Sequence, residues 1–184
     1  MNKINYFRIV GFTVLYVVTV FATAFLGFLS PYAWVFFPVI AALFGAFSYY
    51  LVAVKCQKFG VGVLFAVVLS AFLLAIGECE LFGALLMLMV GVASDAVRQK
   101  VGLTSLKGIS WAYPVLSIGS IVWILPLWTR TKWYCQGAAA ELGIDYAKGL
   151  MTFANLGGLL VVVLLTIIVG FAGILFAAKI IRYK

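Results

Sequence analysis

Histidine is absent from this 184-residue chain, and charged side chains make up only 10% of it. The lack of histidine removes the commonest general base and the commonest metal ligand, which disfavours triad hydrolases, zinc hydrolases and haem sites with an axial histidine. For other enzyme chemistry, only Glu78, Glu80, Glu141, Asp145 and the cysteines are placed to act. We therefore expect a protein that is not an enzyme, without catalytic residues, bound metal or cofactor.

Polar side chains are also too scarce to cover a water-soluble globule, because 66% of the residues are hydrophobic and the mean hydropathy is +1.22. The chain is therefore expected to be an integral membrane protein. Thirteen basic residues give a net charge of +8. In a soluble chain this excess would suggest nucleic-acid binding, but here we interpret it as loop charge that orients membrane helices, with no nucleic-acid partner.

Six apolar stretches are long enough to cross a bilayer, whose core of about 30 Å needs roughly 20 residues per helix, or about 17 in a tight case. They cover residues 9–29, 34–54, 61–77, 81–97, 109–128 and 156–178. None alternates polar and apolar residues as barrel strands do. The first stretch follows basic residues like a signal peptide, but it continues to Leu29, so we expect a retained span. The sequence predicts one all-α domain over residues 1–184, a polytopic bundle of six transmembrane helices.

The basic residues predict the orientation of this bundle. If both termini are cytoplasmic, the inner segments hold ten of the thirteen Lys and Arg residues, as the positive-inside rule requires. These ten are Lys3, Arg8, Lys55, Lys58, Arg98, Lys100, Lys107, Lys179, Arg182 and Lys184. The other three fall in one long extracellular loop between the fifth and sixth helices.

Ionisable residues are missing from the middle of every predicted span. Asp95 and Arg98 lie at the inner end of the fourth span, where we expect them to anchor to lipid headgroups, with pairing across the helix as the alternative. Ion-coupled transporters usually need such groups at mid-membrane depth, and the GxxxxGK[ST] motif of ATP-hydrolysing proteins is absent. If the chain transports a solute, the energy must come from another subunit or from the solute gradient.

Two outer segments are rich in aromatic residues. In residues 31–38, two prolines bracket four aromatics, which indicates either a shaped loop or an interfacial aromatic belt. Residues 129–155 are too long for a simple turn and are interpreted as a lid with a short surface helix starting near Asp145, or else as a passive loop. Aromatic faces near Arg130, Lys132 and Lys148 suit a flat or heteroaromatic, anionic ligand. The candidate substrate-binding residues are Tyr32, Trp34, Trp123, Trp128, Arg130, Trp133, Tyr134, Tyr146 and Asn155.

The outer turn between the third and fourth spans carries Glu78, Cys79 and Glu80. Adjacent side chains rarely converge on one ion, so we interpret the two glutamates as a hydrated acid pair and not as a metal site. Cys79 and Cys135 both fall on the outer side, which makes one disulfide topologically possible.

Small residues at helical spacing mark faces for close helix contact, either within the bundle or against a second membrane subunit. The candidate residues for partner docking are Thr19, Thr23, Gly27, Ala42, Ala46, Gly62 and Ala66.

Several short motifs resemble the Trep_Strep family of bacterial integral membrane proteins, which is grouped with the substrate-binding S components of energy-coupling factor transporters. They are a proline entering the second span, PVIAALFG at residues 38–45, Tyr49-Tyr50, KCQKFG at residues 55–60, Asp145-Tyr146 before the last span, and a small-residue final helix with a basic tail.

The resemblance implies the specificity subunit of an ATP-driven importer in the bacterial plasma membrane. Such a subunit binds a scarce extracellular nutrient, here a vitamin, a tetrapyrrole or a metal chelate. Its partners would be a transmembrane coupling subunit and two cytoplasmic ATPases. The first span departs from the AxxxA pattern that many S components use for docking, since it has Thr19, Thr23 and Gly27 instead. The alternative is a structural or assembly subunit that binds no solute, which predicts a filled bundle interior with no pocket beneath residues 129–155.

Overall fold

The computed structural model describes residues 6–181, and every regular element in this range is helical, as predicted. Lys3, Arg182 and Lys184, which we assigned to the inner side, lie outside the described residues. The elements are α1 (Tyr6–Ala24), the 3₁₀ helix η1 (Phe25–Leu29), α2 (Pro31–Lys55), α3 (Val61–Ala75), α4 (Leu81–Val101), α5 (Leu106–Ser117), α6 (Gly119–Ile124), α7 (Pro126–Thr129), α8 (Thr131–Leu142), α9 (Ile144–Met151) and α10 (Leu156–Ile180).

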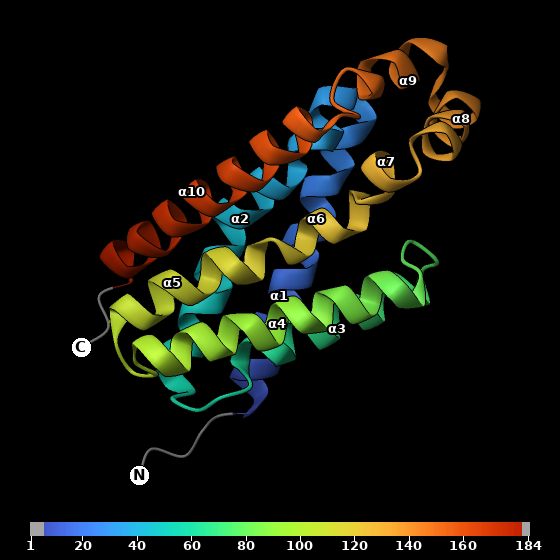
Figure 1. Ribbon diagram of the computed structural model, residues 1–184. Helices are drawn as coiled ribbons and strands as arrows, with labels where there is room; N and C mark the ends of the chain where they lie inside the picture. The colour runs from blue at the N-terminus through green and yellow to red at the C-terminus, as the bar shows by residue number, and fades with distance from the viewer. Residues whose placement is uncertain (1–5, 182–184) are drawn as a thin grey trace.

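Helix α2 is central to the arrangement. It packs against α1, α5 and α10, while α3 and α4 form a pair that joins the rest through α5 and α1 (Figure 1). The α2–α3 and α4–α5 connections lie at one end, with the start of α1 and the end of α10 (Figure 1). We call this the basic end. The α3–α4 turn, α8 and α9 lie at the opposite end, which we call the lid end.

Of the six predicted stretches, four each form a helix that is long and apolar enough to cross a membrane. Among residues 6–181 these are Tyr6–Leu29, which combines α1 with η1, and helices α2, α4 and α10. The third stretch forms α3, which has only 15 residues. The fifth stretch is divided among α5, α6 and α7. Among residues 6–181, four of the six predicted continuous membrane-spanning helices are therefore found as single long helices.

The fifth stretch breaks because its backbone hydrogen bonding is interrupted. Pro126, at the first position of α7, has no N–H to continue the helix from α6. The hydroxyls of Ser117 and Ser120 donate to carbonyls three residues earlier, at 2.8 and 2.7 Å, and compete with regular helix bonding. The segment still advances in one direction toward the lid end (Figure 1).

Helix α3 ends two residues earlier than predicted because Gly77 adopts a left-handed conformation with φ 77°. The N–H of Gly77 donates to the Leu74 carbonyl, and the N–H of Glu78 donates to the Leu73 carbonyl. These two bonds form a Schellman motif, which satisfies the last carbonyls of the helix and turns the chain sharply. The motif places Glu78 at the lid end.

Both outer segments are helical. The shaped loop considered for residues 31–38 is wrong, because Pro31 opens α2 at a position where proline is favoured, and the Ser30 hydroxyl accepts from the Tyr32 N–H at 3.2 Å. Residues 129–155 contain α8 as well as the expected surface helix, α9. Gly143, with φ 95°, separates the two helices.

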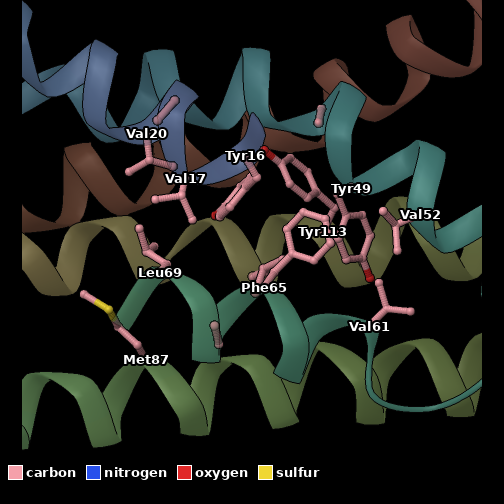
Figure 2. Packing of buried hydrophobic residues seen from close by; sticks show 14 of the residues in the cluster. Tyr16, Val17, Val20, Tyr49, Val52, Val61, Phe65, Leu69, Met87 and Tyr113 are labelled. Atoms are coloured by element: carbon pink, nitrogen blue, oxygen red, sulfur yellow. The ribbon is translucent and has the colours of Figure 1, made fainter. Parts of the chain in front are cut away.

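The bundle interior toward the basic end is filled by aromatic rings from four helices (Figure 2). Tyr16 of α1 and Tyr49 of α2 both contact Phe65 of α3, with ring centroids 5.0 and 5.5 Å apart. Tyr113 of α5 lies 5.2 Å from Tyr49 and donates to the Ala42 carbonyl at 2.8 Å. This half of the bundle is a packed core.

Asp95 and Arg98 do not anchor to lipid headgroups, because both are fully buried. The Asp95 carboxylate accepts from the backbone N–H groups of Gly60, Gly62 and Val63 at 2.9–3.1 Å, and so caps the start of α3. Arg98 donates to the carbonyls of Ala53 and Cys56 at the C-terminal end of α2, and to that of Leu103 in the turn after α4. Each charge therefore meets the helix end whose dipole complements it. The pair fastens α4 to the α2–α3 connection.

The small-residue faces are used within the chain. A Cβ added to Gly62 would lie 2.7 Å from the Gly91 carbonyl oxygen, so α3 and α4 approach backbone to backbone. One added to Gly173 of α10 would lie 3.0 Å from Ala46 of α2. Dispersion at such close contacts drives helix association in lipid.

Candidate functional site

A cavity with two lobes opens at the lid end, beneath α8 and α9. Both lobes share Trp34, Gly77, Glu78, Trp133 and Tyr134. The first lobe, of about 540 Å³, extends along the α3–α4 turn toward α6 and α7. The second, of about 420 Å³, extends toward η1 and α9. Cavities of a few hundred Å³ are of the size that small-molecule ligands occupy.

The floor of the cavity is aromatic. Trp34 of α2 meets Trp123 of α6 edge to face, with centroids 5.8 Å apart. Phe37 packs against both rings, and Phe21 of α1 stacks on Trp123 at 6.2 Å with an angle of 3°. Trp123 is 7% exposed, so these neighbours hold its ring in place. The floor is therefore rigid because each ring is packed by the others.

Hydrogen bonds tie this floor to the elements above it. The Trp34 indole N–H donates to the Tyr134 hydroxyl of α8 at 2.6 Å. The Trp123 indole N–H donates to the Glu78 carboxylate at 3.2 Å. The Tyr146 hydroxyl of α9 donates to the Gly27 carbonyl at 2.7 Å. Three elements that line the cavity are thus fastened to the bundle by aromatic side chains.

Arg130 connects the lid to the α3–α4 turn. Its guanidinium forms an ion pair with Glu80 at 2.9 Å and lies over the Trp133 ring, 5.2 Å from its centroid. The hydrogen bond from Arg130 holds the pKa of Glu80 below its ordinary value, and the same bond raises the pKa of Arg130. Because both groups are exposed, water screens this pair.

Burial raises the pKa values of two tyrosine hydroxyls and two thiols around the cavity. It raises the pKa of the Tyr146 hydroxyl to about 12, and it raises the pKa of the Tyr134 hydroxyl further. Burial also raises the pKa values of the thiols of Cys79 and Cys135. These thiols are free, so the disulfide that topology allowed is not formed. Within residues 6–181, no three His, Cys, Asp or Glu residues come together as a metal site would require.

Six of the nine predicted substrate-binding residues line the cavity. They are Trp34, Trp123, Arg130, Trp133, Tyr134 and Tyr146.

The other three predicted residues support the lid from outside the cavity. Tyr32 packs edge to face on Phe153 at 5.7 Å, and the Trp128 indole N–H donates to the Phe153 carbonyl at 2.8 Å. The Asn155 side chain caps α10 by accepting from the Gly158 N–H at 2.9 Å. These contacts fix the return from α9 into α10.

Glu78 and Glu141 line the cavity but were not among the predicted site residues. The sequence signal for Glu78 was the glycine before it, because a glycine after an apolar helix marks a turn that aims the next residue in a defined direction. Glu141 carried no comparable signal. It reaches the cavity only because α8 folds back over the bundle.

Most residues predicted for partner docking are covered by the chain's own helices. Ala42, Ala46 and Ala66 are at most 4% exposed, and Gly62 is buried against α4. Thr23 is 8% exposed, and Gly27 contacts Trp34. Thr19 alone is half-buried, and its hydroxyl donates to the Leu15 carbonyl at 2.8 Å. Contact of a partner with the covered residues would require the helices to separate.

No curated protein and no solved structure matches the chain. One family model, described as "hypothetical bacterial integral membrane protein (Trep_Strep)", matches residues 6–183 and so covers nearly the whole sequence. The four spanning helices agree with a location in the bacterial cell membrane. The chain therefore belongs to the Trep_Strep family of bacterial integral membrane proteins.

Proposed function

We propose that the chain is the substrate-specificity subunit of an energy-coupling factor importer. The observation that carries the proposal is the cavity beneath α8 and α9. Its floor contains Trp34 and Trp123, and its roof contains Trp133, Tyr134 and Tyr146 of α8 and α9. A scaffold subunit without a solute would have a filled interior at this position. Toward the basic end, by contrast, the rings of Tyr16, Tyr49, Phe65 and Tyr113 fill the bundle interior (Figure 2).

We also propose an orientation of the helices in the membrane. We place the lid end outside the cell and the basic end in the cytoplasm. In addition to the four long spans, α3 would be a short crossing and α5–α7 a composite one, which makes six. Among the described residues, Lys58, Lys100 and Lys107 fall at the basic end, where the positive-inside rule favours them. In intact cells, an impermeant maleimide should label a cysteine at Gly137 and not one at Lys58, in a background with Cys56, Cys79 and Cys135 replaced. The reverse pattern would contradict this orientation.

The energy for uptake would come from partner subunits. The sequence lacks the motif for ATP hydrolysis, and the buried charges Asp95 and Arg98 are engaged with helix ends. A coupling subunit and two ATPases are therefore the partners we propose. Purification from the native membrane under mild conditions should bring all three, and their consistent absence would count against the assignment.

The most direct test of ligand binding is to identify the small molecules that co-purify with the protein. Mass spectrometry of small molecules released from the purified protein should detect one compound in stoichiometric amount. Trp133→Ala, Tyr134→Ala and Tyr146→Ala should reduce its occupancy. Trp111→Ala provides the control, since Trp111 is a comparably exposed aromatic residue on α5 that does not line the cavity. Unchanged occupancy in all three cavity variants would exclude the site, and absence of any bound compound would favour the scaffold role.

A further inference from the structure

The charge of the ligand can be inferred from the cavity walls. Resting on the proposed function, we infer that the cavity beneath α8 and α9 selects a ligand with a cationic, flat aromatic or quaternary nitrogen group. This reverses the anionic ligand predicted from the sequence, because tertiary contacts change which groups the walls present.

Most of the side-chain donors that an anion would need are already engaged within the chain. Arg130 is paired with Glu80, and the indole N–H groups of Trp34 and Trp123 donate to Tyr134 and Glu78. The Tyr146 hydroxyl donates to a backbone carbonyl. The remaining N–H groups of Arg130 and the Tyr134 O–H are free to donate, but the charge of Arg130 is compensated by Glu80. For any further donor, an anionic ligand would have to break the bonds named above, which reduces the gain from binding.

The other basic residues of the lid, Lys132 and Lys148, do not favour an anion in the cavity either. Lys148 forms an ion pair with Asp145 at 3.0 Å, and neither residue lines the cavity. Lys132 is exposed on α8 and is likewise outside the lining. Of the three positive charges that suggested an anion in the sequence, only Arg130 lines the site, and its charge is compensated by Glu80.

The lining keeps hydrogen-bond acceptors and negative charges that no other group in the described part of the chain compensates. The charged residues of the lining are three glutamates and one arginine, namely Glu78, Glu80, Glu141 and Arg130. With Glu80 paired to Arg130, the carboxylates of Glu78 and Glu141 are the uncompensated charges of the lining. Glu78 accepts one hydrogen bond from Trp123, and a carboxylate has room for more. The cavity walls thus carry a net negative charge.

The aromatic walls strengthen this preference. Because its N–H group is engaged elsewhere, Trp34 offers the cavity ring surface and not a hydrogen-bond donor, and Trp123 does the same over the small part of its ring that is exposed. The negative face of an aromatic ring attracts a cation, most strongly for tryptophan. The protein uses this interaction itself, since Arg130 lies over Trp133. Aromatic rings combined with nearby carboxylates are a combination suited to an organic cation.

The test compares three probes of similar size and shape with different charge. These are 1-methylquinolinium, its neutral isostere 1-methylnaphthalene, and 1-naphthoate. Binding is measured by equilibrium dialysis of the protein in nanodiscs made of uncharged lipid, with empty nanodiscs subtracted for partitioning. We expect 1-methylquinolinium to bind at least about 10-fold more tightly than 1-naphthoate, and its affinity to fall with added salt.

Two variants connect the preference to the named carboxylates. Glu78→Gln and Glu141→Gln should each weaken 1-methylquinolinium binding about 3- to 10-fold. They should leave 1-methylnaphthalene binding within about 2-fold, which a general loss of structure would not do. Asp145→Asn is the matched control, because it removes one negative charge from the same lid outside the cavity.

The outcomes separate this inference from the proposed function. Equal or tighter binding of 1-naphthoate, or cation binding that ignores both glutamine variants, overturns the cation inference while the binding site stands. If none of the three probes binds saturably and the native protein releases no compound, the proposed function is overturned as well.

Discussion

The indole nitrogen of Trp34 donates a hydrogen bond to the Tyr134 hydroxyl over 2.6 Å, although the two residues are 100 positions apart in the sequence. The bond joins the start of α2 to the roof of the cavity. It also spans both lobes, since both residues line each of them. A contact between side chains therefore joins the lid to the floor, in addition to the chain connection.

Removing this bond should loosen α8. Tyr134→Phe deletes the acceptor and leaves the ring, so we expect the local stability of α8 to fall by about 1 kcal/mol. Hydrogen exchange of amides in Thr131–Leu142 should become faster while exchange in α2 is unchanged. Lys132→Gln, an exposed change on the same helix, should not alter either rate. Equal exchange in Tyr134→Phe and the parent protein would show that the bond does not hold the lid.

The buried carboxylate of Asp95 should be important for stability. Asp95→Asn keeps the size of the side chain but replaces one acceptor oxygen by a donor that faces the N–H groups at the start of α3. We expect a loss of about 2–4 kcal/mol, seen as a lower Tm in detergent. Asp145→Asn, which makes the same chemical change on an exposed side chain, should leave Tm unchanged. Similar Tm values for both variants would contradict the capping role.

The close approach of α3 and α4 should tolerate no added methyl group. Gly62→Ala places a Cβ 2.7 Å from the Gly91 carbonyl, so the helices must separate, at a cost of about 1–3 kcal/mol. Gly137→Ala on α8 is the control, because an added Cβ there meets no atom within 4 Å and alanine favours the helix. Thermal unfolding should rank Gly62→Ala below the parent and Gly137→Ala level with it or above it. The opposite ranking would exclude backbone contact between the two helices.

The Arg130–Glu80 pair should respond to acid. Its hydrogen bond lowers the pKa of Glu80 in the folded protein, so the pair stabilises the lid above the ordinary glutamate value of 4.5 and is lost as the pH falls through the lowered pKa. The protection factors of amides in α7 and α8, which correct for the pH dependence of intrinsic exchange, should therefore fall below about pH 4.5. In Glu80→Gln the protection factors should already be lower at neutral pH and should show a smaller acid step. An acid step of equal size in both proteins would assign it to another group.

Much of the fold could be predicted from the sequence. Long apolar stretches without charge can satisfy their backbone groups in lipid only as helices, so the all-helical membrane class followed from composition and length. Aromatic residues around 31–38 and 123–146 also pointed to the end of the molecule that holds the cavity, which six of the nine predicted binding residues line. The two broken or short helices were missed, since hydropathy does not register Pro126 or the left-handed Gly77 that end them.

The sequence by itself determined that this chain is helical, is embedded in a membrane and carries its charges at the helix ends. Only the tertiary structure decided what those charges do. Asp95 and Arg98 cap helices that lie far from them in sequence, and Arg130 is neutralised by Glu80, which leaves Glu78 and Glu141 facing the cavity. The physical reason is that a charge acts on whatever lies within a few ångströms of it, and the folding of distant helices sets those neighbours.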